Sequence, residues 1–188
     1  LAHGDKLATS FDIPLDYFLV LKQVHGDDIR VIRPHGDYFT SREALNYDAV
    51  VTNRPNLAIC IKTADCVPLF LVDRVKKVIA AVHAGRSGTA LEIAAKVVRL
   101  MRQQYGSLPG DLLAALGPCI GRCCYEVDGE AARAFQCFAH AGDFLSAGTC
   151  PGKWMLDLVE ANRQQLTESG IPAGNIEASG LCLSLIHI

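Results

Sequence analysis

Two apolar segments near the middle of the chain, joined by a short charged turn, constrain the fold more than any other feature. Val67–Val72 and Val78–Val82 are continuous apolar runs of strand length, which is typical of strands buried inside a sheet. The second run leads directly into His83–Gly88 (HAGRSG), which is rich in small residues, and then into a predicted helix. We therefore expect a strand–loop–helix junction whose backbone N–H groups and helix N-terminus can approach an anion.

Other apolar segments bounded by turn residues predict further strands. These segments are 18–24, 31–34, 48–52, 57–62, 112–116 and 176–183. The polar, punctuated stretch over 35–47 is expected to be a loop.

Three helices are predicted among these strands. Thr89 and Glu92 match a capping box, so the first helix is expected to begin at Thr89 and to stop at Gly106. Its buried face is expected to contain Leu91, Ala94, Ala95, Val98 and Met101. The other two helices are predicted over 130–140 and 154–169. This order of elements indicates a mixed α/β or α+β domain and not a regular βαβ array.

Composition and charge narrow the functional classes. The chain has 188 residues, of which 50% are hydrophobic, so a single domain can bury a core of ordinary size. The formal net charge of −2 argues against a nucleic-acid polymer as partner, because affinity for the phosphate backbone needs a basic excess. No apolar run reaches the ~18 residues of a membrane span, and no signal peptide opens the chain. Because the chain begins at Leu1 and ends in an uncharged stretch, we expect a fragment truncated at both ends.

Eight cysteines bear on the redox compartment. In a chain of this size without an export signal, they predict a reduced, cytoplasmic protein and not a disulfide framework. Cys119, Cys123 and Cys124 have the spacing C-x₃-C-C, which is neither a zinc-ribbon nor a ferredoxin spacing. We expect no disulfide and no shared metal among these three residues, which lie in a Gly/Pro-shaped loop near the functional site. No partner at a useful spacing is found for Cys60, Cys137, Cys150 and Cys182.

Three residues at strand edges beside turns are candidate catalytic residues. His25 follows an apolar strand in KQVHG, Cys66 connects two apolar strands in TADCVP, and His83 ends a strand. Two imidazoles and one thiolate are good ligands for zinc, and three protein ligands with an open position are the layout of a catalytic zinc site. The same residues also fit purely structural roles. They fit equally a cysteine hydrolase or deamidase with Cys66 as nucleophile and His83 as base.

Residues beside these three are candidates for contacts with a substrate. Arg86 brings a fixed positive charge to the junction, and the backbone of Gly85, Ser87 and Gly88 can approach an oxyanion. Asp65, next to Cys66, is a candidate for orienting a ligand or moving protons, and it can equally cap the following turn. A copper-dependent polyphenol oxidase is a weaker alternative, because multicopper oxidation needs many His ligands and the chain has six His in total.

Six segments together resemble the laccase-domain, or polyphenol oxidase, family of purine nucleoside phosphorylases. They are KQVHG at 22–26, DAVVT at 48–52, TADCVP at 63–68, AAVHAGRSGT at 80–89, LGPCIGRCCYEV at 116–127 and WMLDLVEANRQQL at 154–166. The matches follow the family order and cover most of residues 19–180. Together they are highly specific, although each one alone is a weak signal.

This resemblance implies an α+β fold of layered mixed β-sheets flanked by helices, in a single domain over 1–188. It implies that His25, Cys66 and His83 bind a metal ion, zinc, with copper reported under the older oxidase name. It further implies phosphorolysis of adenosine, guanosine, inosine and methylthioadenosine, together with adenosine deamination, by a cytoplasmic enzyme. The chain departs from the family where Arg86 and Ser87 follow His-Ala-Gly. It also lacks the family's opening Gly-Gly-Val-Ser segment and its closing aromatic, Arg-rich segment.

Overall fold

A six-stranded mixed sheet forms the centre of the computed structural model, which describes residues 9–11, 13–14, 17–34 and 46–186. The strand order is β11-β7-β5-β6-β3-β2. The inner pairs are antiparallel, whereas β2 runs parallel to β3 and β11 runs parallel to β7. The mixed-sheet α+β class is confirmed. In chain order the strands are β2 (Ile29–Ile32), β3 (Ala49–Thr52), β5 (Val67–Asp73), β6 (Val78–Ala84), β7 (Leu112–Leu116) and β11 (Ile176–Ala178).

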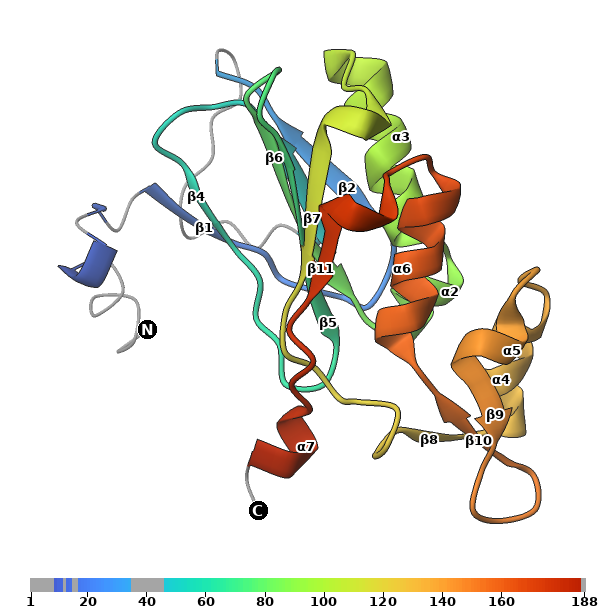
Figure 1. Cartoon of the computed structure of the whole chain (residues 1–188). Coiled ribbons are helices and arrows are strands. Elements are labelled where there is room, and N and C mark those ends of the chain that lie inside the picture. Colours follow the sequence, from blue (N-terminus) through green and yellow to red (C-terminus); the bar gives the residue numbers. More distant parts are fainter. Residues whose placement is uncertain (1–8, 12, 15–16, 35–45, 187–188) are drawn as a thin grey trace.

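The two apolar runs predicted as buried strands occupy the middle of this sheet (Figure 1). β5 and β6 pair antiparallel over their full length, and Leu69, Leu71 and Val82 are fully buried. β6 continues past its predicted end at Val82, so His83 lies within the strand, opposite Pro68 of β5. This pairing places the two candidate segments that contain Cys66 and His83 at the same end of the sheet.

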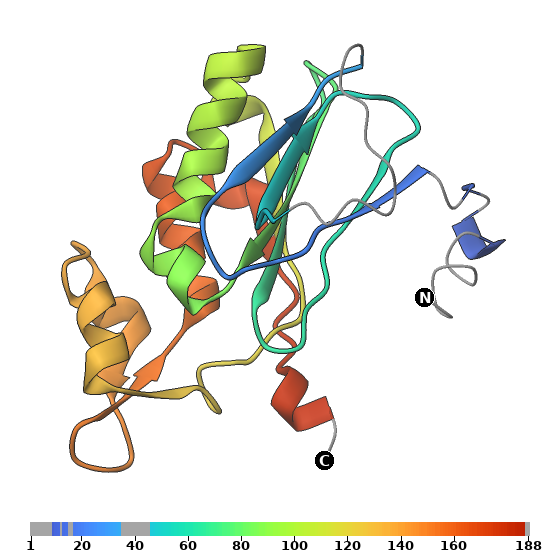
Figure 2. The ribbon, with the colours of Figure 1, turned by 180° about the vertical axis from the view of Figure 1, so that it is seen from behind.

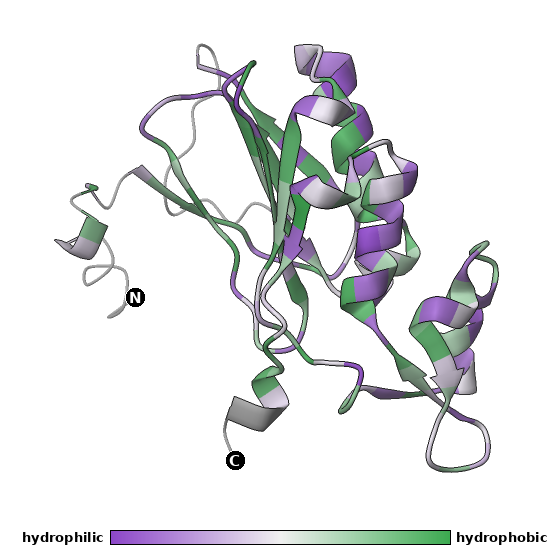
Figure 3. Cartoon of the chain, viewed as in Figure 1, coloured by the Kyte–Doolittle hydropathy of each residue, from purple (hydrophilic) through white to green (hydrophobic). Residues whose placement is uncertain are grey.

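Helices and a smaller sheet cover opposite faces of the central sheet (Figures 1 and 2). On one face lie α3 (Ile93–Tyr105) and α6 (Leu158–Glu168), and on the other lies the parallel pair of β1 (Phe18–Val20) and β4 (Ala58–Cys60). The larger core packs the sheet against the helices, and a second cluster lies under β1 and β4. Figure 3 shows the apolar residues concentrated in the central strands, while the helices carry many hydrophilic ones. β1 and β4 cover only part of the second face, because Phe70 and Val72 of the central strand β5 remain 37% exposed.

A small lobe of three antiparallel strands and two helices follows β7. It contains β8 (Glu126–Asp128), α4 (Gly129–Gln136), α5 (Ala141–Phe144), β9 (Leu145–Ala147) and β10 (Lys153–Leu156), with strand order β8-β10-β9. The helix predicted over 130–140 is α4, which ends at Gln136, and α5 begins only after the predicted end. The helix predicted over 154–169 begins only at Leu158, because Trp154 and Met155 pair with β8 and β9. Asp157 then caps α6 by accepting a hydrogen bond from the Glu160 amide.

Several other predicted elements are shorter in the structure. β1 ends at Val20 and β4 at Cys60, because each pairs only with the other over three residues. The strand predicted over 176–183 is β11 followed by the short helix α7 (Leu183–Ile186). The predicted loop over 35–47 lies mostly outside the described residues. The 3₁₀ turns η2 (Pro109–Asp111) and η3 (Ala173–Asn175) precede β7 and β11. In the described part of the chain, no helix is long and apolar enough to cross a membrane.

The predicted capping box at Thr89 is wrong. Thr89 lies inside the short helix α2 (Arg86–Ala90), is fully buried, and accepts a hydrogen bond from the Asn162 side chain of α6. Glu92 has a left-handed backbone (φ 60°) and separates α2 from α3 without a side-chain capping bond. The break rotates the helix, so Leu91 is exposed and Ala95 only partly buried. The buried face is instead Ile93, Ala94, Val97, Val98 and Met101.

Substitutions at these two positions separate the observed break from a capping box. We expect Glu92→Gly to raise the free energy of unfolding by up to about 1 kcal/mol, because glycine adopts a left-handed conformation without the cost of a side chain. Thr89→Val should lower it by about 1–3 kcal/mol, because the buried Asn162 amide loses one of its two acceptors and keeps only the Leu158 carbonyl. Urea denaturation of both variants measures these changes. If Glu92→Gly instead lowered the free energy of unfolding by as much as the loss of a helix cap does, the break between α2 and α3 at Glu92 would be contradicted.

Candidate metal centre

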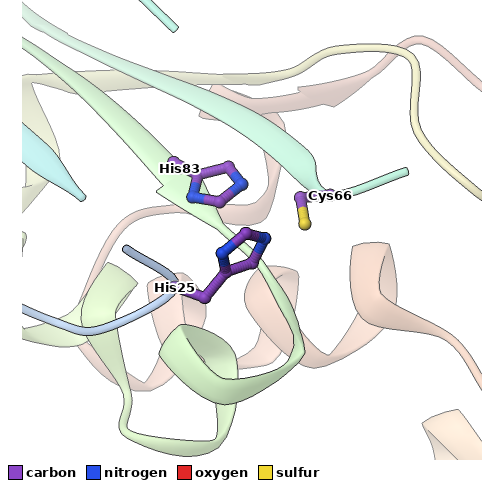
Figure 4. Close-up of side chains that lie close together, drawn as sticks. All are labelled: His25, Cys66 and His83. Carbon is purple, nitrogen blue, oxygen red and sulfur yellow. The ribbon is translucent and has the colours of Figure 1, made fainter. Parts of the chain in front are cut away.

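Three of the candidate residues converge on one place. The ligand atoms of His25, Cys66 and His83 all lie within 4.8 Å of one another, and Figure 4 shows the three side chains pointing toward each other. The two imidazole rings meet edge to face, with their centroids 4.8 Å apart. The residues come from three separate segments of the chain, so their convergence is a product of the fold.

Strand pairing brings Cys66 and His83 together. His83 is in β6 opposite Pro68, the second residue of β5, and Cys66 immediately precedes β5. The Thr63 hydroxyl donates a hydrogen bond to the Cys66 carbonyl, which shapes the turn into the strand. Cys66 is half-buried and His83 is buried. The antiparallel register of β5 and β6 therefore determines the position of two of the three donors.

A buried carboxylate holds His25 in place. Asp48, just before β3, accepts hydrogen bonds from the backbone N–H groups of Val24 (3.3 Å), His25 (2.9 Å) and Gly26 (2.7 Å). His25 has a positive φ of 61°, a conformation that costs a non-glycine residue energy. Three amide donors on one carboxylate compensate that cost and fix the turn, so the imidazole of His25 is presented to the other two donors.

The same carboxylate orients His83. Asp48 Oδ1 lies 2.8 Å from His83 Nδ1, and the exposed fractions of the two residues are 0% and 3%. With Nδ1–H donating to the carboxylate, Nε2 is left with its lone pair free for a ligand, which is the usual arrangement of a metal-binding histidine. In the sequence, Asp48 is marked only by its place in the motif DAVVT, where a carboxylate precedes an apolar strand. Reasoning from the sequence did not select it as a site residue.

The donor set fits a metal cofactor. Two imidazole nitrogens and one thiolate suit Zn²⁺ and copper, and three protein ligands leave a position open for substrate or water. Burial raises the pKa of the Cys66 thiol, and the negative charges of Asp65 and Asp48 raise it further. A cation beside the sulfur would reverse this effect, because it stabilises the thiolate.

Two glycines allow the junction after β6 to lie close to the three donors. A Cβ atom on Gly85 would lie 3.0 Å from Cys66 Sγ and 3.3 Å from His25 Cδ2. A Cβ atom on Gly88 would lie 2.7 Å from the Gly26 carbonyl oxygen, closer than real contacts allow. Both glycines are buried. The close approach accounts for their presence, and their predicted role as oxyanion contacts stays a prediction.

The remaining predicted site residues lie at the solvent side of the centre. Arg86 and Ser87 are exposed at the start of α2, and Asp65 is exposed beside Cys66. The Arg86 guanidinium donates a hydrogen bond to the Tyr125 hydroxyl; burial raises the pKa of Tyr125, and the Arg86 charge partly offsets this. The Ile120 amide donates to the Asp65 carbonyl (2.9 Å), so the loop of residues 117–125 packs against the Cys66 turn as expected.

All eight cysteines are free thiols, in agreement with the predicted absence of disulfides. Cys119 is buried, which with nearby negative groups raises its pKa to about 12, so it behaves as a packing residue. The spacing predicted no partner for Cys182. In the structure its backbone forms a parallel β-bridge with the backbone of Cys119, and its sulfur lies close to those of Cys123 and Cys124. The sequence spacing missed this contact because the final segment returns to the loop from the far end of the chain.

The chain is similar to known proteins over most of its length. The family described as "Multi-copper polyphenol oxidoreductase laccase" matches residues 2–185. A purine nucleoside phosphorylase YlmD from Bacillus subtilis is 33% identical over 182 residues, which cover 94% of this chain and 65% of that protein. A protein named adenosine deaminase RL5, from an unknown prokaryotic organism, is 36% identical, with 96% of this chain and 71% of that protein covered.

Solved structures share the fold. A crystal structure of the Bacillus licheniformis hypothetical protein YfiH superposes with a TM-score of 0.88 at 37% identity, covering 97% of this chain and 70% of the other. The 188-residue chain thus spans about two thirds of the length of the relatives that it matches.

Loss of the Asp48 carboxylate should weaken metal binding. We expect Asp48→Asn to lower metal affinity about 10–100-fold, because an amide cannot accept all four hydrogen bonds or hold the His83 ring as a carboxylate does. Competition with a chelator measures the affinity. Asp27→Asn is the matched control, since it makes the same charge change two residues from His25, where Asp27 pairs with Lys96. Equal losses in the two variants would show that net charge, and not the Asp48 hydrogen bonds, controls the affinity.

Proposed function

The chain belongs to the multi-copper polyphenol oxidoreductase laccase family, and from this premise we propose that it is a zinc-dependent purine nucleoside phosphorylase that also deaminates adenosine. The proposed substrates are adenosine, inosine, guanosine and methylthioadenosine, with inorganic phosphate as co-substrate. The names of two relatives, a phosphorylase and a deaminase, support this chemistry. The observation that carries the proposal is the convergence of His25, Cys66 and His83 within 4.8 Å of one another.

His25, Cys66 and His83 would hold the zinc ion. When bound there, it would supply Lewis-acid chemistry by polarising a water or a substrate oxygen. His83 is the most buried of the three residues, and its ring is oriented by a hydrogen bond with Asp48. His25 is exposed, so a nucleoside reaches the centre from the His25 side.

Phosphorolysis needs a cationic contact for the phosphate and a proton donor for the departing purine. In this reaction a phosphate oxygen attacks C1′ of the ribose while the bond to the base breaks. Arg86 is exposed at the entrance and is positioned by its hydrogen bond with Tyr125, so it is the proposed phosphate contact. Asp65, exposed beside Cys66, is the proposed group for proton transfer, both here and when water replaces the amino group at C6 of adenosine.

Two alternatives use the same residues. A cysteine hydrolase would need a Cys66 thiol with a lowered pKa, whereas burial and two carboxylates raise the pKa of this thiol. A polyphenol oxidase would place copper at the same three donors. The eight free thiols are consistent with the reducing cytoplasm, where we propose that the enzyme acts.

The first test replaces Cys66. We expect Cys66→Ser to lose bound zinc together with both nucleoside activities, because a serine hydroxyl is a poor zinc ligand at neutral pH. Elemental analysis and chromatography of the purine products, with and without phosphate, measure the two effects. Phosphate-dependent release of hypoxanthine from inosine identifies phosphorolysis, and inosine formed from adenosine identifies deamination. Loss of activity at full zinc content, with Cys66 of the unchanged protein labelled by iodoacetamide, would identify the cysteine hydrolase instead.

The second test separates the two reactions at Arg86. Arg86→Ala should raise the KM for phosphate about 10–100-fold, because a charge-assisted contact to the anion is lost. Adenosine deamination, which uses no phosphate, should change much less. Arg133→Ala removes an exposed positive charge from α4 and serves as the control. A parallel loss of both activities would refute the assignment of Arg86 as the phosphate contact.

A further inference from the structure

A second group of metal-binding side chains lies outside the centre described above. The sulfur atoms of Cys123, Cys124 and Cys182 all lie within 4.8 Å of one another. Cys123 is exposed, and the other two residues are half-buried. The mechanism proposed for the first centre uses none of these thiols, so the group needs an explanation of its own.

Two segments from distant parts of the chain build this group. Cys123 and Cys124 lie in a turn that is closed by a hydrogen bond from the Cys124 amide to the Gly121 carbonyl (3.0 Å). Cys182 is held next to this turn by its parallel bridge with Cys119, in which the Leu183 amide donates to the Cys119 carbonyl at 2.8 Å. In Figure 1 the segment between β11 and α7 lies beside the start of the loop that follows β7. The backbone thus fixes the third thiol opposite the first two.

Gly121 is the contact point of the group. Its amide donates a hydrogen bond to Cys182 Sγ (3.2 Å), and a hydrogen bond donated to sulfur favours the thiolate that metals bind. A Cβ atom at this position would lie 3.1 Å from Cys182 Cβ and 3.4 Å from Cys123 Sγ. Glycine therefore allows two sulfurs from different segments to approach the same stretch of backbone.

The sulfur spacing suits one ion. Cys123 Sγ and Cys124 Sγ are 3.5 Å apart, and two sulfurs bound to one tetrahedral zinc at its usual bond length lie about 3.8 Å apart. A cavity of about 490 Å³, lined in part by Cys123, Arg122 and Cys182, opens beside the group, so an ion can enter from solvent. Three soft sulfur donors select thiophilic ions over magnesium or calcium.

We propose that Cys123, Cys124 and Cys182 form a second metal site, which binds one thiophilic ion of the Zn²⁺ or Cu⁺ type. This proposal departs from the expectation that Cys119, Cys123 and Cys124 share no metal, because their spacing alone did not include Cys182. The site joins the loop of residues 117–125 to the segment that follows β11. It is independent of the donors His25, Cys66 and His83.

Metal stoichiometry tests the proposal. The reduced, metal-free 188-residue chain is titrated without oxygen with Zn²⁺ and, separately, with Cu⁺, against a chromophoric chelator. We expect two equivalents bound by the unchanged chain in at least one titration. One equivalent should remain in Cys182→Ser and in Cys123→Ser, each checked for its fold by circular dichroism. Cys137→Ser, which removes an exposed cysteine elsewhere in the chain, should keep both equivalents.

Further variants make the outcome specific to this site. Cys66→Ala should also bind one equivalent of metal fewer than the unchanged chain, and Cys66→Ala combined with Cys182→Ser should bind none. If the first centre bound no metal, a loss of bound metal in Cys182→Ser would still support the second site. Gly121→Ala, which keeps every thiol, should weaken the second site about tenfold by displacing Cys182. Cobalt substitution should give sulfur-to-metal absorption that falls strongly in Cys182→Ser. For both ions, the same number of bound equivalents in the unchanged chain, in Cys182→Ser and in Cys123→Ser would overturn the proposal.

Discussion

The carboxylate of Asp48 is the interaction on which the candidate metal centre depends. It is fully buried and accepts four hydrogen bonds, three from consecutive backbone amides and one from the His83 ring. A buried carboxylate without such partners costs several kcal/mol, so the turn around His25 and the ring of His83 are fixed together. The Asp48 carbonyl also accepts the His83 amide in the β3–β6 pairing (2.7 Å). One residue thus connects the sheet, the turn and the donors.

The three candidate ligands could be selected from the sequence because their signals are local. His25, Cys66 and His83 each stand at the end of an apolar segment beside a turn, and family motifs surround all three. Asp48 and Gly85 were harder to interpret, since their roles depend on distances between segments that no spacing reveals. Cys182 was missed for the same reason: its neighbours are 58 to 63 positions away, and only the parallel β-bridge between the backbones of Cys119 and Cys182 makes them contacts. Sequence patterns find donors, whereas register and backbone close approach decide which of them meet.

The predicted fold was accurate where burial and local pattern agree. Val67–Val72 and Val78–Val82 form the paired central strands β5 and β6, although Phe70 and Val72 of the first run are exposed. Gly106 ends α3 in a left-handed conformation. The prediction was wrong where tertiary contacts override a local motif. Thr89 matches a helix cap but instead binds Asn162 of α6, and Trp154 lies in an apparent helical pattern but pairs with β8 and β9. In each case a contact with an element distant in sequence replaces the structure that the local pattern predicts.

The return of the final segment to Cys119 has a consequence for synthesis. The ribosome adds roughly 5–20 residues per second, so His25, Cys66 and His83 have all been synthesised on the order of ten seconds before Cys182. Cys123 and Cys124 are synthesised well before Cys182, the third thiol of their group. The backbone bridge between Cys119 and Cys182 can form only after Cys182 has been made. During this interval two adjacent thiols are exposed on a nascent chain whose central strands have already been made. The redox state of the surroundings during translation therefore matters for which sulfur contacts form.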